Sequence, residues 1–142
     1  MIKLLGRGDA DVLRNAAPGV FDDSLIPSAT EEFLADERHH LAVAIDGDVV
    51  IGFASAVHYV HPDKPNPEMW INEVGVALSH QNRGAGRALL RALFARAREL
   101  GCSEAWVLTE RSNAAAMRMY AALAGREGSS DTVMFTYDPK EL

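Results

Sequence analysis

Two glycines and two arginines stand close together between a predicted strand, residues 69–78, and a predicted helix that begins at residue 87. The stretch consists of Gln81, Asn82, Arg83, Gly84, Ala85, Gly86 and Arg87. A glycine-rich turn between a strand and a helix exposes backbone N–H groups at the helix N-terminus, where a phosphate group is favoured. Gly84 and Gly86 also lack a Cβ atom, so a ligand can lie against the backbone. The stretch predicts a phosphate-binding site; the alternative is a solvated turn before a surface helix.

Two common phosphate-binding motifs fit this stretch poorly. A P-loop requires Gly-Lys-Ser/Thr, whereas Gly86 is followed by Arg87 and Ala88. A dinucleotide-binding turn requires a third glycine, and Leu89 occupies that position. The acidic residue of that motif should end a strand, whereas Glu104 begins one. A dinucleotide is therefore only a weak alternative.

The composition is that of a globular domain with an acidic charge balance. The chain has 142 residues, 48% of them hydrophobic and 24% charged, which is enough for one domain with a buried core. Fourteen basic and twenty acidic residues give a net charge of −6, which argues against nucleic acid as a partner. The negative charge is compatible with a cationic substrate.

Neither a membrane nor a metal is expected as a partner. The most apolar stretch, residues 49–57, is far too short to span a membrane, and no signal peptide is recognised at the N-terminus. The single cysteine, Cys102, excludes an internal disulfide and fits a reducing compartment, so we expect a cytoplasmic protein. The histidines include no second cluster at metal-ligand spacing.

The periodicity of apolar residues predicts an α/β fold with a mixed sheet. Strands are expected over 2–5, 41–45, 49–60, 69–78, 105–108 and 132–137, and helices over 9–16, 30–35, 87–100 and 113–124. His39 and His40 are expected in a loop, and the strand over 105–108 is expected to be covered on both faces. Residues 46–48, Asp-Gly-Asp, predict a tight hairpin, which a purely parallel sheet would not contain.

The spacing Gln81-x-x-Gly84-x-Gly86 resembles the coenzyme A signature of the GCN5-related N-acetyltransferases (GNAT). Residues 73–76, Glu-Val-Gly-Val, resemble the end of the fourth strand of that family, and residues 113–120 resemble its next motif, an asparagine and then a tyrosine on a helix. The resemblance implies a mostly antiparallel sheet of six to seven strands, with helices on both faces and splayed central strands.

The same resemblance divides a single acetyltransferase domain, residues 1–142, into three parts. It implies acceptor-side helices over 1–40, an acetyl-CoA-binding core over 41–125 and a closing strand within 126–142. The pyrophosphate of acetyl-CoA would lie on the N–H groups of residues 82–87. The implied acetyl-CoA-binding residues are Val74, Gly75, Val76, Gln81, Asn82, Arg83, Gly84, Ala85, Gly86, Arg87, Asn113 and Tyr120.

Tyr120 and Glu73 are the expected catalytic residues. The resemblance implies that the Tyr120 hydroxyl acts as the general acid for the departing thiolate; the alternative is a core aromatic residue. Asn113 lies seven residues before Tyr120, on nearly the same face of a helix, and would contact the pantetheine. Glu73 is the candidate base, directly or through a water, or else a surface carboxylate. Strand alternation places it on the same face as Ile71 unless a bulge intervenes.

The resemblance implies an acetyl-CoA-dependent N-acetyltransferase that acts on a primary amine of a small cationic molecule by direct transfer in a ternary complex. Residues 117–139 are similar in order to the aminoglycoside 3-N-acetyltransferase group, including Ala124-Gly-Arg-Glu127 and Val133-Met-Phe-x-Tyr-Asp-Pro139. A protein or peptide amino group is the alternative acceptor, and a CoA-binding sensor without turnover is the alternative that is not an enzyme. A homodimer is possible, since dimers are common in this family.

Overall fold

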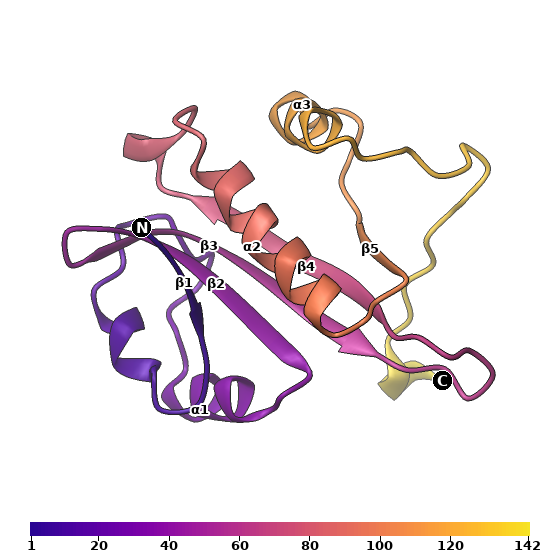
Figure 1. Ribbon diagram of the computed structural model, residues 1–142, viewed down its shortest axis with the longest axis horizontal. Helices are drawn as coiled ribbons and strands as arrows, with labels where there is room; N and C mark the ends of the chain where they lie inside the picture. The colour runs from indigo at the N-terminus through magenta and orange to yellow at the C-terminus, as the bar shows by residue number, and fades with distance from the viewer. The chain divides into compact units, whose positions relative to one another are not determined.

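A five-stranded sheet frames the first part of the chain (Figure 1). The computed structural model describes residues 1–142, which divide into two units, Met1–Glu110 and Arg111–Leu142. The strands of the first unit are β1 (Ile2–Leu5), β2 (His39–Asp46), β3 (Val49–Tyr59), β4 (Glu68–Val76) and β5 (Glu104–Val107). They lie in sequence order, and all pairings are antiparallel except the parallel pairing of β4 with β5. The mixed sheet is confirmed, but it has five strands rather than six or seven.

The β2–β3 hairpin is confirmed at the predicted turn. Asp46 pairs with Val49, and Gly47 between them has a φ of 62°. This left-handed conformation is strained for residues with a Cβ atom and free for glycine. The turn chemistry of three residues was therefore enough to locate the hairpin.

Helix α2 (Ala85–Glu99) covers one face of the sheet (Figure 1). Its residues Leu89, Leu90 and Leu93 are fully buried. The facing strand positions are small, because Ala42 and Ala54 form a cross-strand pair with no exposed surface. Small side chains allow the helix to approach the sheet closely, so the apolar face of this amphipathic helix packs directly on these strands.

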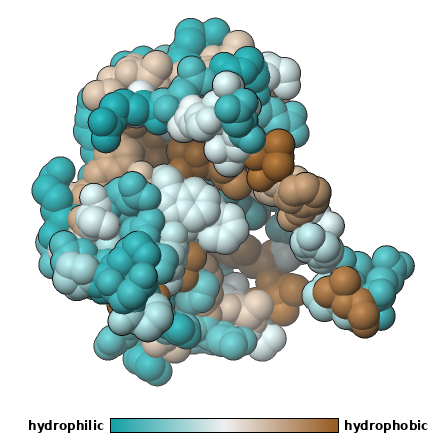
Figure 2. All heavy atoms as spheres, turned by 90° about the vertical axis from the view of Figure 1, so that its right-hand side faces the viewer, coloured by the Kyte–Doolittle hydropathy of each residue, from teal (hydrophilic) through white to brown (hydrophobic).

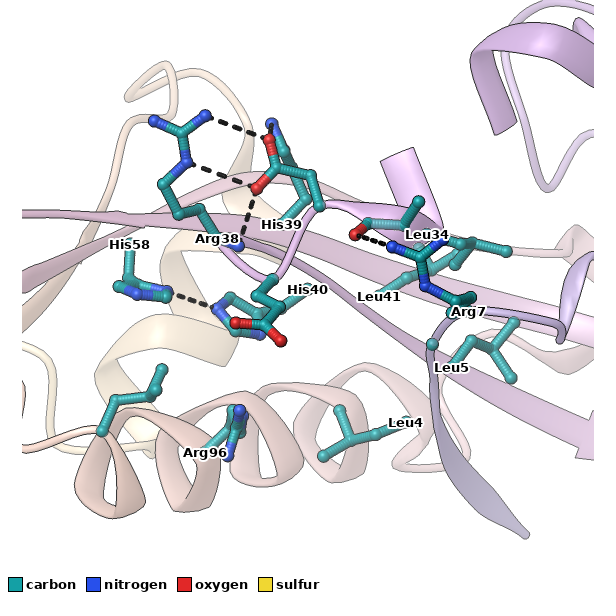
Figure 3. A pocket seen from close by; sticks show the side chains of 15 residues that line it. Leu4, Leu5, Arg7, Leu34, Arg38, His39, His40, Leu41, His58 and Arg96 are labelled. Atoms are coloured by element: carbon teal, nitrogen blue, oxygen red, sulfur yellow. Dashed lines mark hydrogen bonds and ion pairs between the residues drawn. The ribbon is translucent and has the colours of Figure 1, made fainter. Parts of the chain in front are cut away.

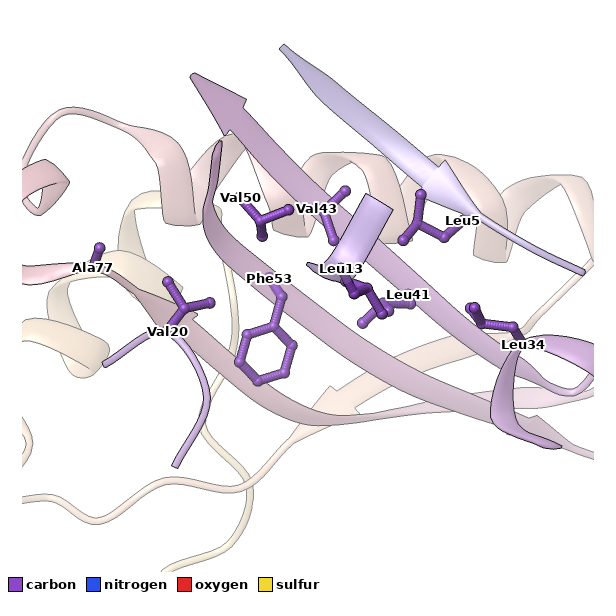
Figure 4. Close-up of a cluster of buried hydrophobic side chains, with 9 residues drawn as sticks. All are labelled: Leu5, Leu13, Val20, Leu34, Leu41, Val43, Val50, Phe53 and Ala77. Carbon is purple, nitrogen blue, oxygen red and sulfur yellow. The ribbon is translucent and has the colours of Figure 1, made fainter. Parts of the chain in front are cut away.

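The opposite face carries a hydrophobic cluster that the N-terminal segment covers (Figure 4). The 3-10 helix η1 (Ala10–Arg14) and helix α1 (Pro27–Ala35) lie on this face. The cluster consists of Leu5, Leu13, Val20, Leu34, Leu41, Val43, Val50, Phe53 and Ala77. Helices therefore lie on both faces of the sheet, as expected.

Strands β4 and β5 pair over only part of their neighbouring edge. The parallel register runs from Glu68 opposite Glu104 to Ile71 opposite Val107, where β5 ends. Strand β4 continues to Val76, and its edge on the β5 side has no strand partner beyond Ile71. This arrangement agrees with the predicted splayed central strands, and it leaves backbone groups of β4 available to a ligand.

The second unit contains α3 (Ala114–Ala122) and the 3-10 turn η3 (Pro139–Glu141). Asn113 caps α3, since its Oδ1 accepts a hydrogen bond of 3.1 Å from the Ala116 N–H. At the other end, the Gly125 N–H donates to the Tyr120 carbonyl at 2.9 Å and the Ala124 N–H donates to the Ala121 carbonyl at 3.0 Å. These two bonds form a Schellman motif, in which Ala124 takes the left-handed position with a φ of 64°.

Replacing Ala124 with glycine should stabilise the protein by about 1 kcal/mol, because glycine adopts this left-handed conformation without the Cβ penalty. The free energy of unfolding from urea denaturation measures the effect. Ala122→Gly, two residues earlier inside the same helix, is the matched control and should destabilise by about 1 kcal/mol. A loss of stability in Ala124→Gly would contradict the assigned helix end.

The predicted closing strand over 132–137 is wrong. No strand forms anywhere in residues 126–142. The apolar side chains of this segment are exposed, by 71% for Val133, 76% for Met134 and 75% for Phe135. A segment of high β-propensity forms a strand only where a neighbouring strand supplies hydrogen bonds, and this segment has no such partner.

Figure 2 shows one face of the molecule, which is mostly hydrophilic, with separate groups of hydrophobic atoms.

Several predicted boundaries also needed correction. The residues expected to form a helix over 9–16 form only the short η1. Helix α1 begins with Pro27 rather than Thr30, because proline suits the first turn, which has no use for its missing N–H. His39 and His40 begin β2 rather than forming a loop. Every residue of β5 is exposed or half-buried, so the expected burial on both faces is wrong for this edge strand.

None of the helices has both the length and the hydropathy needed to span a membrane.

Candidate active site

The turn before α2 displays a row of unused backbone N–H groups. Asn82 and Gly84 are left-handed, with φ values of 63° and 87°. The first helical hydrogen bond runs from the Ala88 N–H to the Gly84 carbonyl at 3.0 Å, and the N–H groups of residues 82–87 donate to no acceptor within the chain. Alternating conformations of this kind turn successive N–H groups toward one point, and the helix dipole adds positive potential there. This geometry is suited to binding an anion.

Contacts with neighbouring elements hold this turn in place. The Gln81 side chain donates to the Val76 carbonyl at 3.0 Å, which ties the turn to the end of β4. His80 Nε2 lies 2.9 Å from Asp46 Oδ2 in the β2–β3 hairpin. Arg83 and Arg87 are exposed and form no ion pair, so both guanidinium groups can add positive charge beside the turn. The side-chain role of Gln81 in the structure is therefore to position the turn.

A bulge in β4 decides which way Glu73 faces. Ser55 of β3 pairs with Glu73, whereas the next residue, Ala56, pairs with Ile71, so Asn72 is an extra residue in β4. The extra residue reverses the alternation and places Glu73 on the face opposite Ile71. The prediction that Glu73 shares a face with Ile71 held only for a regular strand, and the bulge overturns it.

Glu73 therefore lies on the face that the N-terminal segment covers. Its partner Ser55 shares that face with Phe53, which belongs to the hydrophobic cluster. The Glu73 side chain is exposed and forms no ion pair. An exposed carboxylate without an ion-pair partner can accept a proton from a bound molecule.

Gly75 allows the N-terminal segment to cross β4. A Cβ atom at this position would lie 2.6 Å from the Val20 carbonyl oxygen and 2.9 Å from Phe53 Cε1. Phe53 in turn packs on Phe21, with ring centroids 4.4 Å apart. Because the nearest obstacle is backbone, residues 20–21 would have to move to accept any side chain here. The absence of a side chain at Gly75 thus allows the segment around Val20 to pack against the end of β4.

Replacing Gly75 with alanine should destabilise the protein by about 1–3 kcal/mol, the usual cost of overpacking. Urea denaturation monitored by circular dichroism measures this loss. Gly6→Ala is the control in the same unit, since nothing lies within 4 Å of a Cβ there and its φ is ordinary. Gly6→Ala should change stability by less than about 0.5 kcal/mol. Equal stability of the Gly75→Ala variant and the wild type would contradict the close approach.

Tyr120 and Asn113 belong to the second unit. The Tyr120 side chain is half-buried, and burial raises the pKa of its hydroxyl above the usual range. The group therefore keeps its proton at neutral pH, as a proton donor must. Asn113 is engaged as the cap of α3 through its Oδ1, a role that the sequence motif alone did not indicate. The remaining amide NH₂ of Asn113 has no partner within the chain.

A separate cavity of about 560 Å³ lies at the other end of α2 (Figure 3). His40 and His58 face each other there, with 2.8 Å between His40 Nε2 and His58 Nδ1. Burial lowers the pKa of His40 to about 4, and the nearby His58 and Arg96 contribute. None of the predicted site residues lines this cavity. It is therefore distinct from the anion site of the turn.

The structure thus defines a mixed α/β domain in which strand β4 is followed by a turn with free N–H groups and by helix α2. A profile of the Acetyltransferase (GNAT) family matches residues 11–125. This match spans most of the chain, and the chain belongs to that family. The family expected from the sequence motifs is confirmed.

Individual relatives show the same relationship. The streptothricin acetyltransferase of Streptomyces lavendulae is 38% identical over 86 residues, which is 61% of this chain and 43% of that protein. The chain thus spans less than half the length of this curated relative. An aminoglycoside acetyltransferase from an uncultured soil metagenomic sample, solved in complex with trehalose, aligns with a TM-score of 0.80 at 19% identity, covering 97% of this chain and 95% of that one.

Two further solved structures share the fold. The aminoglycoside N-acetyltransferase AAC(6')-Iy, in complex with CoA, has a TM-score of 0.75 at 22% identity and covers 97% of this chain and 99% of that one. The ribosomal-protein-alanine N-acetyltransferase from Brucella melitensis biovar Abortus 2308 has a TM-score of 0.72 at 20% identity, with 96% and 99% covered. At these identities the likeness establishes the GNAT fold.

Proposed function

We propose that the chain is an acetyl-CoA-dependent N-acetyltransferase that acts on a primary amine of a small cationic molecule by direct transfer in a ternary complex. The observation that carries the proposal is the row of free N–H groups over residues 82–87, in a chain of the GNAT family. Such a row fits the pyrophosphate of coenzyme A, and Arg83 and Arg87 add charge. Acetyl-CoA supplies the activated acetyl group.

The unpaired edge of β4 would hold the extended arm of the same molecule. Beyond Ile71 this edge offers N–H and C=O groups, which suit the amides of pantetheine in the way that an added strand would. Val74, Gly75 and Val76 lie on this part of β4. The amide NH₂ of Asn113, free of other partners, would bind a pantetheine carbonyl.

Glu73 and Tyr120 would handle the two protons of the reaction. An ammonium group must lose a proton before its nitrogen can attack a thioester, and Glu73 accepts that proton directly or through a water. The Tyr120 hydroxyl gives its proton to the sulfur that departs, or donates a hydrogen bond to it. The raised pKa of Tyr120 supports this assignment, because a donor has to be protonated at working pH.

A small polycationic amine is the proposed acceptor. The relative from Streptomyces lavendulae is a streptothricin acetyltransferase, and two of the neighbouring structures are aminoglycoside acetyltransferases. The net charge of −6 favours a cationic partner. A protein amino group is the second candidate, supported by the ribosomal-protein-alanine N-acetyltransferase among the neighbours.

Release of free thiol from acetyl-CoA tests the proposal. The assay uses a panel of aminoglycosides, polyamines and a lysine-containing peptide, with thiol release followed spectroscopically. We expect saturable release with at least one small polyamine or aminoglycoside and less with the peptide. Saturable acetyl-CoA binding without thiol release for any amine would instead identify a CoA-binding sensor.

A further inference from the structure

We propose that Trp70 is a specificity-determining residue for the acceptor, and that the acceptor is an amine carried on a saturated ring that packs against the Trp70 indole. The inference rests on the proposed function, with Glu73 as the proton acceptor. It adds to that function a residue that recognises the ring carrying the amine rather than the amine itself.

Trp70 is one half of a rigid aromatic pair on the surface of the sheet. Its indole stacks on that of Trp106, with ring centroids 5.1 Å apart and 7° between the planes. The Trp106 Nε1–H donates to the Tyr59 hydroxyl at 2.7 Å, which fixes the inner member of the pair. Trp70 is 37% exposed, whereas Trp106 and Tyr59 are half-buried. The pair therefore presents a preorganised apolar surface whose accessible part belongs to Trp70.

The bulge at Asn72 brings this surface and Glu73 onto one face. Trp70 pairs with Val57 and Glu73 pairs with Ser55, two residues further back along β3. Two residues along a strand span about 7 Å. An amino group that is bound at Glu73 and carried on a six-membered ring would place that ring against Trp70. A short acyclic amine bound at Glu73 would not extend that far.

The neighbours of Trp70 on β3 leave its indole accessible. Trp70 lies opposite Val57, and the same-face positions on either side of Val57 are Ser55 and Tyr59. Val57 and Ser55, toward Glu73, are shorter than an indole, and Tyr59 on the other side bonds to Trp106. A ring of about 5 Å could lie over Val57 and Ser55 and contact the indole that projects beside them. The contact would combine apolar burial with the attraction of an aromatic ring for a neighbouring cation.

The charges on this face favour a cation over an anion. Glu68 pairs with Tyr59 and with Glu104, so these carboxyl groups lie on the same face as Trp70. The hydrogen bond from His61 holds the pKa of Glu68 below its usual range, so this carboxyl group is ionised at neutral pH, and it pairs with His61. Strands β3, β4 and β5 contain no lysine or arginine. A cationic ring would therefore be preferred to an anionic one.

A comparison of two diamines with the same spacing between amino groups separates the contribution of the ring to binding from that of the charges. cis-1,3-Diaminocyclohexane carries the ring, and 1,3-diaminopropane lacks it. We expect wild type to prefer the cyclic diamine in kcat/KM. In Trp70→Ala, KM for the cyclic diamine should rise about tenfold, with kcat unchanged and no change for the acyclic diamine. Trp70→Phe should restore part of the preference. An equal loss for both diamines, or no loss for the cyclic one, would overturn the proposal.

Tryptophan fluorescence provides a test that does not depend on turnover. The chain contains two tryptophans, and both belong to this pair. Titration with the cyclic diamine should change the fluorescence of wild type in a saturable way, and the acyclic diamine should not. Trp70→Phe keeps an aromatic ring if Trp70→Ala fails to fold, and its signal then comes from Trp106 alone. Binding of the cyclic diamine without thiol release would contradict the proposed function but support Trp70 as a ring-binding residue. No binding of the cyclic diamine would contradict that role of Trp70.

Discussion

Replacing Tyr120 with phenylalanine should lower kcat by about 10²- to 10⁴-fold, the range by which a positioned general acid accelerates a reaction. The substitution removes one hydroxyl oxygen and keeps the ring. The dissociation constant of acetyl-CoA should therefore stay within about twofold of wild type. Stopped-flow thiol release gives kcat, and isothermal titration calorimetry gives the dissociation constant.

Tyr137→Phe provides the matched control for this experiment. Tyr137 is 67% exposed and has no proposed role in the reaction, so the same loss of a hydroxyl should leave kcat within about twofold. Because burial raises the pKa of Tyr120, its loss of a proton should affect the rate only at strongly alkaline pH. Unchanged turnover in Tyr120→Phe would remove Tyr120 from the mechanism.

Replacing Glu73 with glutamine should lower kcat/KM at neutral pH by about 10²-fold and change the shape of the pH–rate profile. A carboxylate can accept a proton from a bound amine, whereas the amide of glutamine cannot. Any limb of the profile that depends on the carboxylate as base should therefore be absent from the variant. The measurement is kcat/KM over a pH series at a fixed acetyl-CoA concentration.

Glu99→Gln is the control for the charge change. Glu99 ends α2 and pairs with Arg96 at 3.1 Å, away from the turn at the start of the helix. Its replacement should leave the profile as in wild type. A profile of Glu73→Gln with the same limb as wild type would assign proton acceptance to another group.

The local chemistry of short motifs made much of the fold predictable. The Asp46-Gly47-Asp48 turn located the hairpin, and the apolar period after residue 87 located α2 to within two residues at its start. The glycine turn was predicted to expose N–H groups, and Asn82 and Gly84 adopt the left-handed conformations that do so. In each case a few neighbouring residues determine the backbone conformation.

Features that depend on distant partners were not predictable in this way. The bulge at Asn72 exists because of the register between β3 and β4, and it reverses the face of Glu73. The apolar residues over 132–137 have the composition of a strand but no pairing edge. The stacking of Trp70 on Trp106 requires the parallel register of β4 with β5, which spans more than thirty residues of sequence. Periodicity along the chain contains no information on these pairings.

The position of bound acetyl-CoA tests the central claim most directly. A crystal structure of the protein soaked with acetyl-CoA would show which groups hold the pyrophosphate. The account predicts its oxygens within hydrogen-bond distance of the N–H groups of residues 82–87, with the pantetheine along β4 between Asn72 and Val76. Density for the pyrophosphate at any other place, or a vacant turn at saturating acetyl-CoA, would contradict it.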